Sequence, residues 1–474
     1  MIGLILLIAL ATPMPAYSPK PPCPQSVGAS NSILNFILPD VGACPPTLWA
    51  KTFEGVGGAS VHPTSDGGFI VVGSKKPSTN FPPDIYVLRL NADGGVIWQK
   101  TYGGNNPMFS PAGNSGESVD LTSDGGFIVA GQANYFGAGY ADFWVLRLDA
   151  NGNVLWQRTY GGVRSDGYWP QVRTTSNGNF VLVGRTDSFG SGGDLWVLLL
   201  DPNGGIIWQK TYGGSAYDGS YPSVGLVSDG GFIVASATNV TNYFGAGNVD
   251  AWVLRIDALG NVMWQKTYGG LAQDSPWIEN SVQQTSDGGF VVTGYTSSFG
   301  AGGQDFWVLR LDGNGTVLWQ KAYGGTQDDV AYSADLTSDG GFIVSGYTKS
   351  FGAGGQDRWL LRLDYNGNLV WQKTYGGNRD EGSHSIRVTS DGGFISIGFQ
   401  ESFGGGGLWV LRLDANGGLP PTCSLGTSSN AVTTTSTPVI NDPSQSFIAS
   451  NSAATVTFTT IAGVGTSVKI TKQC

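Results

Sequence analysis

Five acidic residues recur at one position of a repeated sequence, four residues after the second glycine of the motif YGG. They are Asp166, Asp218, Asp274, Asp329 and Glu381. Carboxylate oxygens are the ligands that Ca²⁺ prefers in proteins, so an arc of these side chains could bind a cation or a basic partner. Alternatively, each acid accepts hydrogen bonds from the backbone amides of its own loop.

Two tryptophans, Trp169 and Trp277, lie in the same connections as these acids. An exposed indole beside a carboxylate is typical of a surface that binds glycans. Glycans are therefore candidate partners, together with other surface proteins and further copies of this chain.

Residue types that perform nucleophilic catalysis are scarce. The chain has two histidines, His62 and His384, and no serine motif typical of a nucleophile elbow. We therefore assign no catalytic residue, expect a protein that is not an enzyme, and consider Ca²⁺ the one candidate cofactor. The net charge of −10 argues against a nucleic-acid partner, because phosphate binding requires clustered lysine and arginine.

The elements that carry these residues are repeated seven times. The phenylalanine of the motif SDGGF, or of its variant SNGNF, recurs every 52 to 58 residues, at Phe69, Phe127, Phe180, Phe232, Phe290, Phe342 and Phe394. In each unit, runs such as FIVSG and WVLRL predict short strands, and DGG and DxNGN predict tight turns. Each unit is thus expected to form four strands.

Seven four-stranded units predict an all-β fold, a seven-bladed β-propeller of antiparallel blades. Thirteen of the fifteen tryptophans fall at two positions of the repeat, in the third and fourth strands, and we expect them to fill the interfaces between blades. The third strand of every unit but one also carries a mid-strand arginine. Because a buried arginine needs a partner, we expect a bond from blade to blade at Arg89, Arg147, Arg255, Arg310, Arg362 and Arg412.

The fourth-strand pattern, as in LDANGNVLWQRTYGG, resembles the tryptophan-docking repeat of quinoprotein-type propellers. It resembles more closely the tandem propeller repeats of exported bacterial and archaeal proteins. The resemblance covers about residues 48–419 and implies the fold. Quinoprotein enzymes bind their cofactor through calcium and acidic ligands, often with a disulfide between adjacent cysteines. No two cysteines are adjacent here, so the resemblance does not extend to the enzyme's site.

The two ends of the repeat array complement each other. The last unit stops after LWVLRLDANGG, without a fourth strand, whereas PPTLWAKTFEG near the start is a fourth strand without a unit. We predict that the two ends pair and close the ring, with Leu48 and Trp49 beside Trp409 and Leu411. Four cysteines allow three pairings. Closure favours Cys44 with Cys423, which leaves Cys23 with Cys474.

The segments outside the propeller (47–419) suggest export. Residues 1–18 contain a short apolar run that predicts a signal peptide, too short to span a membrane, and 19–46 form an N-terminal extension. We expect a secreted or cell-surface protein with no membrane span in the mature chain. Residues 420–474 are rich in serine and threonine and predict a small β tail.

The β tail has two interpretations. It folds back on its own propeller as a hairpin, or it donates a strand to a neighbouring copy. The first suits a structural or binding module at the cell surface, which is the function we expect. The second suits a self-assembling subunit of an extracellular filament or surface layer. A quinoprotein-like or glycan-active enzyme is the alternative from another class.

Overall fold

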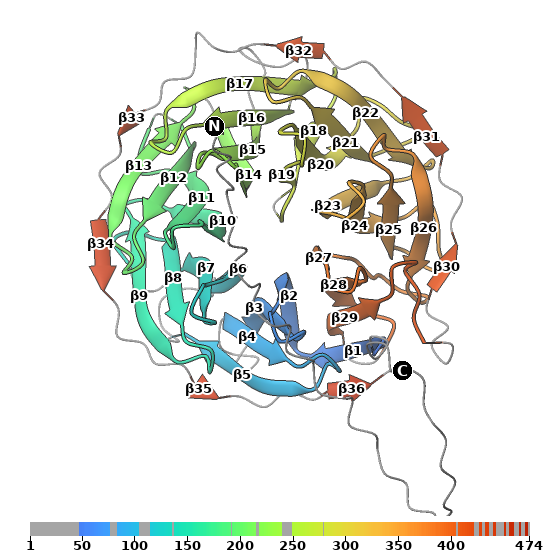
Figure 1. Ribbon diagram of the computed structural model, residues 1–474, viewed down its shortest axis with the longest axis horizontal. Helices are drawn as coiled ribbons and strands as arrows, with labels where there is room; N and C mark the ends of the chain where they lie inside the picture. Colours follow the sequence, from blue (N-terminus) through green and yellow to red (C-terminus); the bar gives the residue numbers. More distant parts are fainter. Residues whose placement is uncertain are drawn as a thin grey trace, which may run out of the picture. The chain divides into compact units, whose positions relative to one another are not determined.

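The computed structural model describes residues 47–75, 83–103, 114–134, 137–190, 192–214, 218–238, 249–277, 279–403 and 406–420, and seven short segments between 426 and 472. These residues form strands and turns arranged as a seven-bladed β-propeller (Figure 1). In the part of the chain that is described, no helix is long and apolar enough to cross a membrane. The predicted signal peptide, the N-terminal extension and all four cysteines lie outside the described residues.

Each blade is an antiparallel sheet whose strands follow one another from the central axis outward. Blade 1 consists of β2 (Val56–Pro63), β3 (Phe69–Lys75), β4 (Asp84–Leu90) and β5 (Val96–Tyr102). Blade 2 consists of β6 (Ser115–Leu121), β7 (Phe127–Ala133), β8 (Asp142–Leu148) and β9 (Val154–Gly161). Blade 3 consists of β10 (Asp166–Thr174), β11 (Phe180–Thr186), β12 (Asp194–Leu200) and β13 (Ile206–Tyr212).

The remaining blades follow the same order, with one interruption. Blade 4 consists of β14 (Asp218–Leu226), β15 (Phe232–Thr238), β16 (Asp250–Ile256) and β17 (Val262–Gly269). In blade 5 the innermost strand is split, and the blade consists of β18 (Asp274–Pro276), β19 (Val282–Gln284), β20 (Phe290–Thr296), β21 (Asp305–Leu311) and β22 (Val317–Gly324). Blade 6 consists of β23 (Asp329–Leu336), β24 (Phe342–Thr348), β25 (Asp357–Leu363) and β26 (Leu369–Tyr375).

Blade 7 joins the two ends of the repeat array, as the sequence predicts. Its first three strands are β27 (Ser385–Val388), β28 (Phe394–Gln400) and β29 (Gly407–Leu413), and its fourth is the N-terminal β1 (Trp49–Glu54). β1 runs antiparallel to β29, with Ala50 opposite Leu411 and Thr52 opposite Trp409. Closure leaves no blade of the ring without a neighbour.

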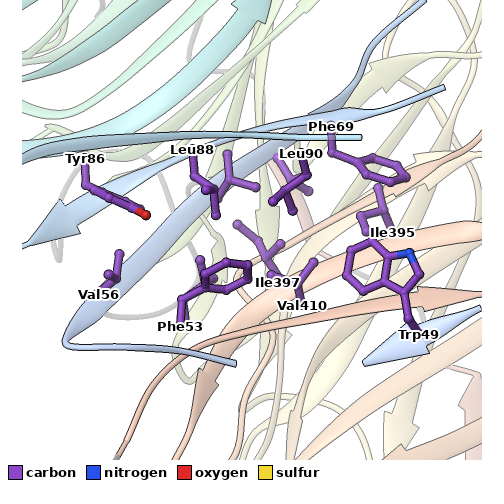
Figure 2. Packing of buried hydrophobic residues seen from close by; sticks show 13 residues of the cluster. Trp49, Phe53, Val56, Phe69, Tyr86, Leu88, Leu90, Ile395, Ile397 and Val410 are labelled. Atoms are coloured by element: carbon purple, nitrogen blue, oxygen red, sulfur yellow. The ribbon is translucent and has the colours of Figure 1, made fainter. Parts of the chain in front are cut away.

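The side chains at this join form one buried core (Figure 2). Trp49 and Phe53 of β1 pack with Phe69 of blade 1 and with Ile397 and Val410 of blade 7. The rings of Trp49 and Phe69 meet edge to face, with centroids 6.0 Å apart. The join is therefore held by the same kind of apolar interface that separates the other blades.

The fourth strand of each blade also binds a turn of the next blade. In blade 1, Trp98 donates its indole N–H to the carbonyl of Ala150 (3.0 Å), and the Tyr102 hydroxyl donates to the carbonyl of Gly152 (2.7 Å). Gly152 has a φ of 72°, and a Cβ there would lie 2.8 Å from the Trp98 ring, so the turn requires glycine. The same tyrosine bond recurs at Tyr160–Gly204, Tyr212–Gly260, Tyr268–Gly315, Tyr323–Gly367 and Tyr375–Gly417.

The mid-strand arginines bond within their own blades, so the prediction of a bond from blade to blade is wrong. Arg147 of β8 donates from Nη2 to both carboxylate oxygens of Asp124 (2.6 and 2.5 Å), which lies in the turn between β6 and β7. Equivalent pairs occur in blades 1, 4, 5, 6 and 7. Blade 3 lacks both partners, with Leu199 at the arginine position and Asn177 at the aspartate position.

The C-terminal tail adds an outer strand to every blade. Its short strands run around the ring in Figure 1 and pair antiparallel with the fourth strands of blades 6, 5, 4, 3, 2, 1 and 7 in turn. They are β30 (Gly426–Ser428), β31 (Val432–Thr435), β32 (Val439–Asn441), β33 (Ser450–Asn451), β34 (Thr455–Phe458), β35 (Val464–Gly465) and β36 (Ile470–Lys472). The tail thus pairs with its own propeller as a belt of separate strands, where the sequence predicted a hairpin or a donated strand.

Candidate functional site

One position of the innermost strand departs from the repeat in every blade. From blade 1 to blade 7 it is occupied by Ala59, Glu117, Trp169, Tyr221, Trp277, Tyr332 and His384. In blades 1 to 4 and 6 the strand has a register shift at this position, and in blade 5 the strand is broken here. A β-bulge leaves one residue outside the ladder and changes the direction of its side chain.

Two of these residues have backbone conformations that aromatic residues rarely adopt. Trp169 and Tyr221 have φ angles of 53° and 54°. The left-handed region costs energy for a bulky side chain, and such strain is concentrated at binding sites and active sites. The same strained conformation occurs in two adjacent blades, which indicates that the orientation of these rings matters.

The aromatic side chains form a continuous arc across five blades. The ring of Trp169 lies 4.3 Å from that of Tyr221, which stacks on Trp277 at 4.5 Å with an interplanar angle of 12°. Trp277 meets Tyr332 edge to face at 5.1 Å, and Tyr332 lies 5.8 Å from His384. We call these five residues the aromatic arc.

The break in the innermost strand of blade 5 places two polar residues across the axis. The Glu279 carboxylate accepts hydrogen bonds from Ser60 in blade 1 (2.8 Å) and from Arg387 in blade 7 (3.1 Å). The neighbouring Asn280 accepts from Arg173 in blade 3 (3.1 Å) and donates to a carbonyl of blade 6 (2.6 Å). This plug, Glu279 and Asn280, therefore ties blade 5 to four other blades.

Three residues of the aromatic arc, Glu279 of the plug and small residues of blades 1 and 2 line a pocket of about 310 Å³. Its walls include Ala59, Glu117, Trp277, Glu279, Tyr332 and His384, and the rest is mainly glycine backbone of blades 1 and 2. We call it the axial pocket. The glycines and Ala59 add no large side chain to their part of the wall.

The axial pocket contains two carboxyl groups in different settings. Glu279 is only 4% exposed, and its Oε1 is paired, while its Oε2 has no hydrogen-bond partner. Burial raises the pKa of Glu117, and the negative charge of Glu279 raises it further. Burial lowers the pKa of His384, whose Nδ1–H donates to the carbonyl of Gly58 (2.6 Å).

The predicted arc of acids accepts hydrogen bonds within its own connections. Asp274, for example, is fully buried and accepts hydrogen bonds from the backbone N–H of Gly270 (2.7 Å) and from the hydroxyl of Ser298 (2.6 Å). Equivalent backbone bonds are made within the connections by Asp166, Asp218, Asp329 and Glu381. Among the described residues no three potential metal-ligating side chains cluster. Each acid therefore accepts hydrogen bonds within its own loop, which is the alternative that the sequence left open.

The other predicted positions lie either at the join in blade 7 or outside the described residues. Trp49, Trp409 and Leu411 lie in the paired strands of blade 7, whereas Leu48 precedes β1 and is half-buried. The disulfides predicted for Cys44, Cys423, Cys23 and Cys474 fall outside the described residues and stay predictions.

Sequence reasoning identified only part of the axial pocket. It singled out Trp277 and considered His384, which both line the pocket, but it missed Glu117, Glu279 and Tyr332. Trp169, which it also singled out, contacts Trp277 through Tyr221 and does not line the pocket. A signal was present, because the residue three places after each of the five recurring acids is tryptophan, tyrosine or histidine, while the positions around it vary.

Comparison with known proteins identifies no family. No family model and no curated protein matches the sequence. Among solved structures, Sqt1 from Chaetomium thermophilum is 10% identical, with 78% of this chain and 100% of that chain covered and a TM-score of 0.41. Endo-1,5-alpha-L-arabinanase from Thermotoga petrophila RKU-1 is 13% identical, with coverages of 78% and 100% and a TM-score of 0.28. Similarities at this level say nothing about ligand or activity.

Proposed function

We propose that the chain is an exported, non-enzymatic β-propeller that acts as a binding module at the cell surface and holds its ligand in the axial pocket. One observation carries the proposal. In a chain of nearly identical repeats, the seven inner-strand positions differ from blade to blade, and five of them hold the aromatic arc. A concave site with aromatic walls and a few polar groups is typical of ligand binding.

The polar groups of the axial pocket support binding because the protein holds them in fixed orientations. His384 donates to the Gly58 carbonyl, and Glu279 accepts from Ser60 and Arg387. Side chains fixed in this way are preorganised for a ligand.

The tryptophan-docking type of repeat is a further part of the proposal. Trp98 donates its indole N–H to the turn of the next blade, and six other fourth-strand tryptophans occupy the equivalent position. This arrangement fits the resemblance seen in the sequence. Export is tested separately, by N-terminal sequencing of the protein collected outside its native host cells. An intact N-terminus in a protein that stays inside the cell would contradict it.

The binding role is tested with a thermal-shift and calorimetric panel of small amines, neutral oligosaccharides and short peptides. We expect a compound that binds the wild type to lose at least about tenfold in affinity in Trp277→Leu, the change equivalent to about 1.4 kcal/mol. Trp371→Leu, on the fourth strand of blade 6, is the matched control. Ligands that bind equally well to Trp277→Leu would place the binding site elsewhere.

A glycan-active enzyme is the second candidate, because the axial pocket holds two carboxyl groups in unlike environments. Burial raises the pKa of Glu117, whereas Glu279 is paired with Arg387. A protonated acid beside a carboxylate is the pair that glycoside hydrolysis uses. Release of reducing ends from polysaccharides by the wild type, and its loss in Glu117→Gln, would establish this activity over the non-enzymatic role.

A further inference from the structure

We infer that the ligand of the axial pocket is a positively charged organic group, an ammonium or a guanidinium. This inference rests on the proposed binding function and adds the chemical class of the ligand. The group is either part of a small free amine or the end of a lysine or arginine side chain on a partner protein. The two sources share the same chemistry at the pocket and differ in what lies outside it.

The first argument is charge. Two of the residues that line the pocket are acidic, Glu117 and Glu279, and Arg387 pairs with Glu279 at 3.1 Å. Two negative charges against one positive charge leave an excess of one when both acids are ionised. A bound cation would balance that excess.

The second argument is an unpaired acceptor. Glu279 Oε2 is buried without a hydrogen-bond partner, in a side chain that lines the pocket. A buried acceptor without a partner costs free energy. An ammonium or guanidinium carries only donors, so it can bond this oxygen without bringing a further acceptor to a site already rich in carboxylates.

The third argument is the aromatic wall. Trp277 and Tyr332 line the pocket, and the face of an aromatic ring attracts a cation within about 6 Å, tryptophan most strongly. A neutral sugar also stacks on such rings, but it would leave the excess negative charge uncompensated. The combination of aromatic faces with carboxylates therefore favours a cation.

The size of the pocket agrees with a single cationic group. Ligand pockets range from about 300 to 1,000 Å³, and a volume of about 310 Å³ lies at the small end. Gly57, Gly58 and Ala59 of blade 1 line the pocket without large side chains, which leaves room for an aliphatic stem.

The experiment measures binding of matched charged and neutral probes to the full chain by calorimetry. The probes are butylammonium and butylguanidinium, with butanol as the neutral control, then an N-acetyl-lysine amide, and a neutral tetrasaccharide series. We expect the cations to bind, butanol to bind at least about tenfold more weakly, and Glu117→Gln to weaken cation binding about tenfold or more. Glu401→Gln, which removes an exposed acid of blade 7, is the matched control and should bind as the wild type does.

Glu117→Gln is the main variant because Glu279→Gln also removes the partner of Arg387 and could disturb folding. Trp277→Leu provides a second variant that keeps the charges. Preference for the lysine amide over butylammonium would indicate a protein partner, and the reverse would indicate a small amine. Cation binding that does not change in Glu117→Gln and Trp277→Leu would overturn the inference.

Failure of this inference is distinguishable from failure of the proposed function. Tetrasaccharide binding that depends on Trp277 but not on Glu117, without cation binding, would overturn the cation and retain the pocket as a binding site. If neither cations nor oligosaccharides bind, and Trp277→Leu changes no interaction of the exported protein, both proposals are overturned.

Discussion

Arg310 is a buried guanidinium whose charge is matched by one aspartate of its own blade. Its side chain is 0% exposed, and Nη2 donates to both carboxylate oxygens of Asp287 at 2.5 Å. The Tyr365 hydroxyl also donates to Asp287 (2.8 Å), and its ring lies over the guanidinium. We predict that Asp287→Asn destabilises the propeller, because the guanidinium then stays buried beside a neutral amide.

The size of the effect follows from the Coulomb attraction between Arg310 and Asp287 and from how far each side chain is buried. Two unit charges about 4 Å apart attract by about 4 kcal/mol at an effective dielectric constant of 20. The Asp287 side chain is 42% exposed, so water screens part of this attraction. Allowing for roughly half, we expect Asp287→Asn to lower the free energy of unfolding by about 2 kcal/mol.

Blade 3 shows which double variant to compare. There Asn177 and Leu199 stand where the other blades have aspartate and arginine, so a blade forms without the pair. Urea unfolding of Asp287→Asn, Arg310→Leu and the double variant gives a thermodynamic cycle. We expect Asp287→Asn to cost about 2 kcal/mol alone and less than about 0.5 kcal/mol in the Arg310→Leu background. Asp93→Asn, an exposed turn aspartate, is the control, and equal costs in both backgrounds would refute the reasoning.

Four further predictions concern the join in blade 7, the loops, pH and the tail. Trp49→Ala should lower the free energy of unfolding in urea by about 3–5 kcal/mol, because the indole is buried where β1 closes blade 7. Trp98→Ala, which removes a half-buried indole, should lower it less, and equal losses would contradict this. Asp274→Asn should lower the melting temperature, because the side chain accepts hydrogen bonds within its loop, and leave any response to Ca²⁺ unchanged. A Ca²⁺ response that depends on Asp274 would instead support a cation site there. Burial raises the pKa values of Asp84, Asp142 and Asp305 to about 6, so the unfolded chain loses these protons at a lower pH than the folded protein does. Stability in urea should therefore fall as pH rises from about 4 to about 6. A flat profile would refute this contribution. A chain ending at Leu419 should self-associate in light scattering because its outermost strands lose their partners, and a stable monomer would show that these edges need no cover.

Fold and blade count were predictable because the repeat acts locally. Strands such as Phe342–Thr348 and turns such as the one closed by Gly367 are encoded within a few residues, and copying the unit seven times fixes the ring. The absence of a fourth strand after Leu413 and the orphan strand at Trp49 then required the two ends to pair. Pairing of this kind follows from counting strands, without any knowledge of side-chain contacts.

The arginine partner and the belt depend on information that the repeat does not contain. In a chain of equivalent blades, Arg310 has an aspartate in its own turn, Asp287, and another in the turn of the next blade, Asp339, and spacing alone does not decide between them. Similarly, the tail strands are short and polar, and nothing in Val432–Thr435 indicates that it pairs with β22 rather than with another edge. Both choices are made by tertiary geometry.

The axial pocket was hidden for the opposite reason, because it is built where the repeats disagree. Structural positions are repeated in this chain because every interface between blades has the same shape, so Tyr102 and Gly152 have counterparts around the ring. The axis is the one place where all blades meet a common space, and there a change in one blade needs no matching change in the next. Differences among Glu117, Tyr221 and His384 are therefore free of the packing constraint that keeps the rest uniform. In a propeller with near-identical blades, the inner-strand residues that diverge most are the first to test for ligand binding.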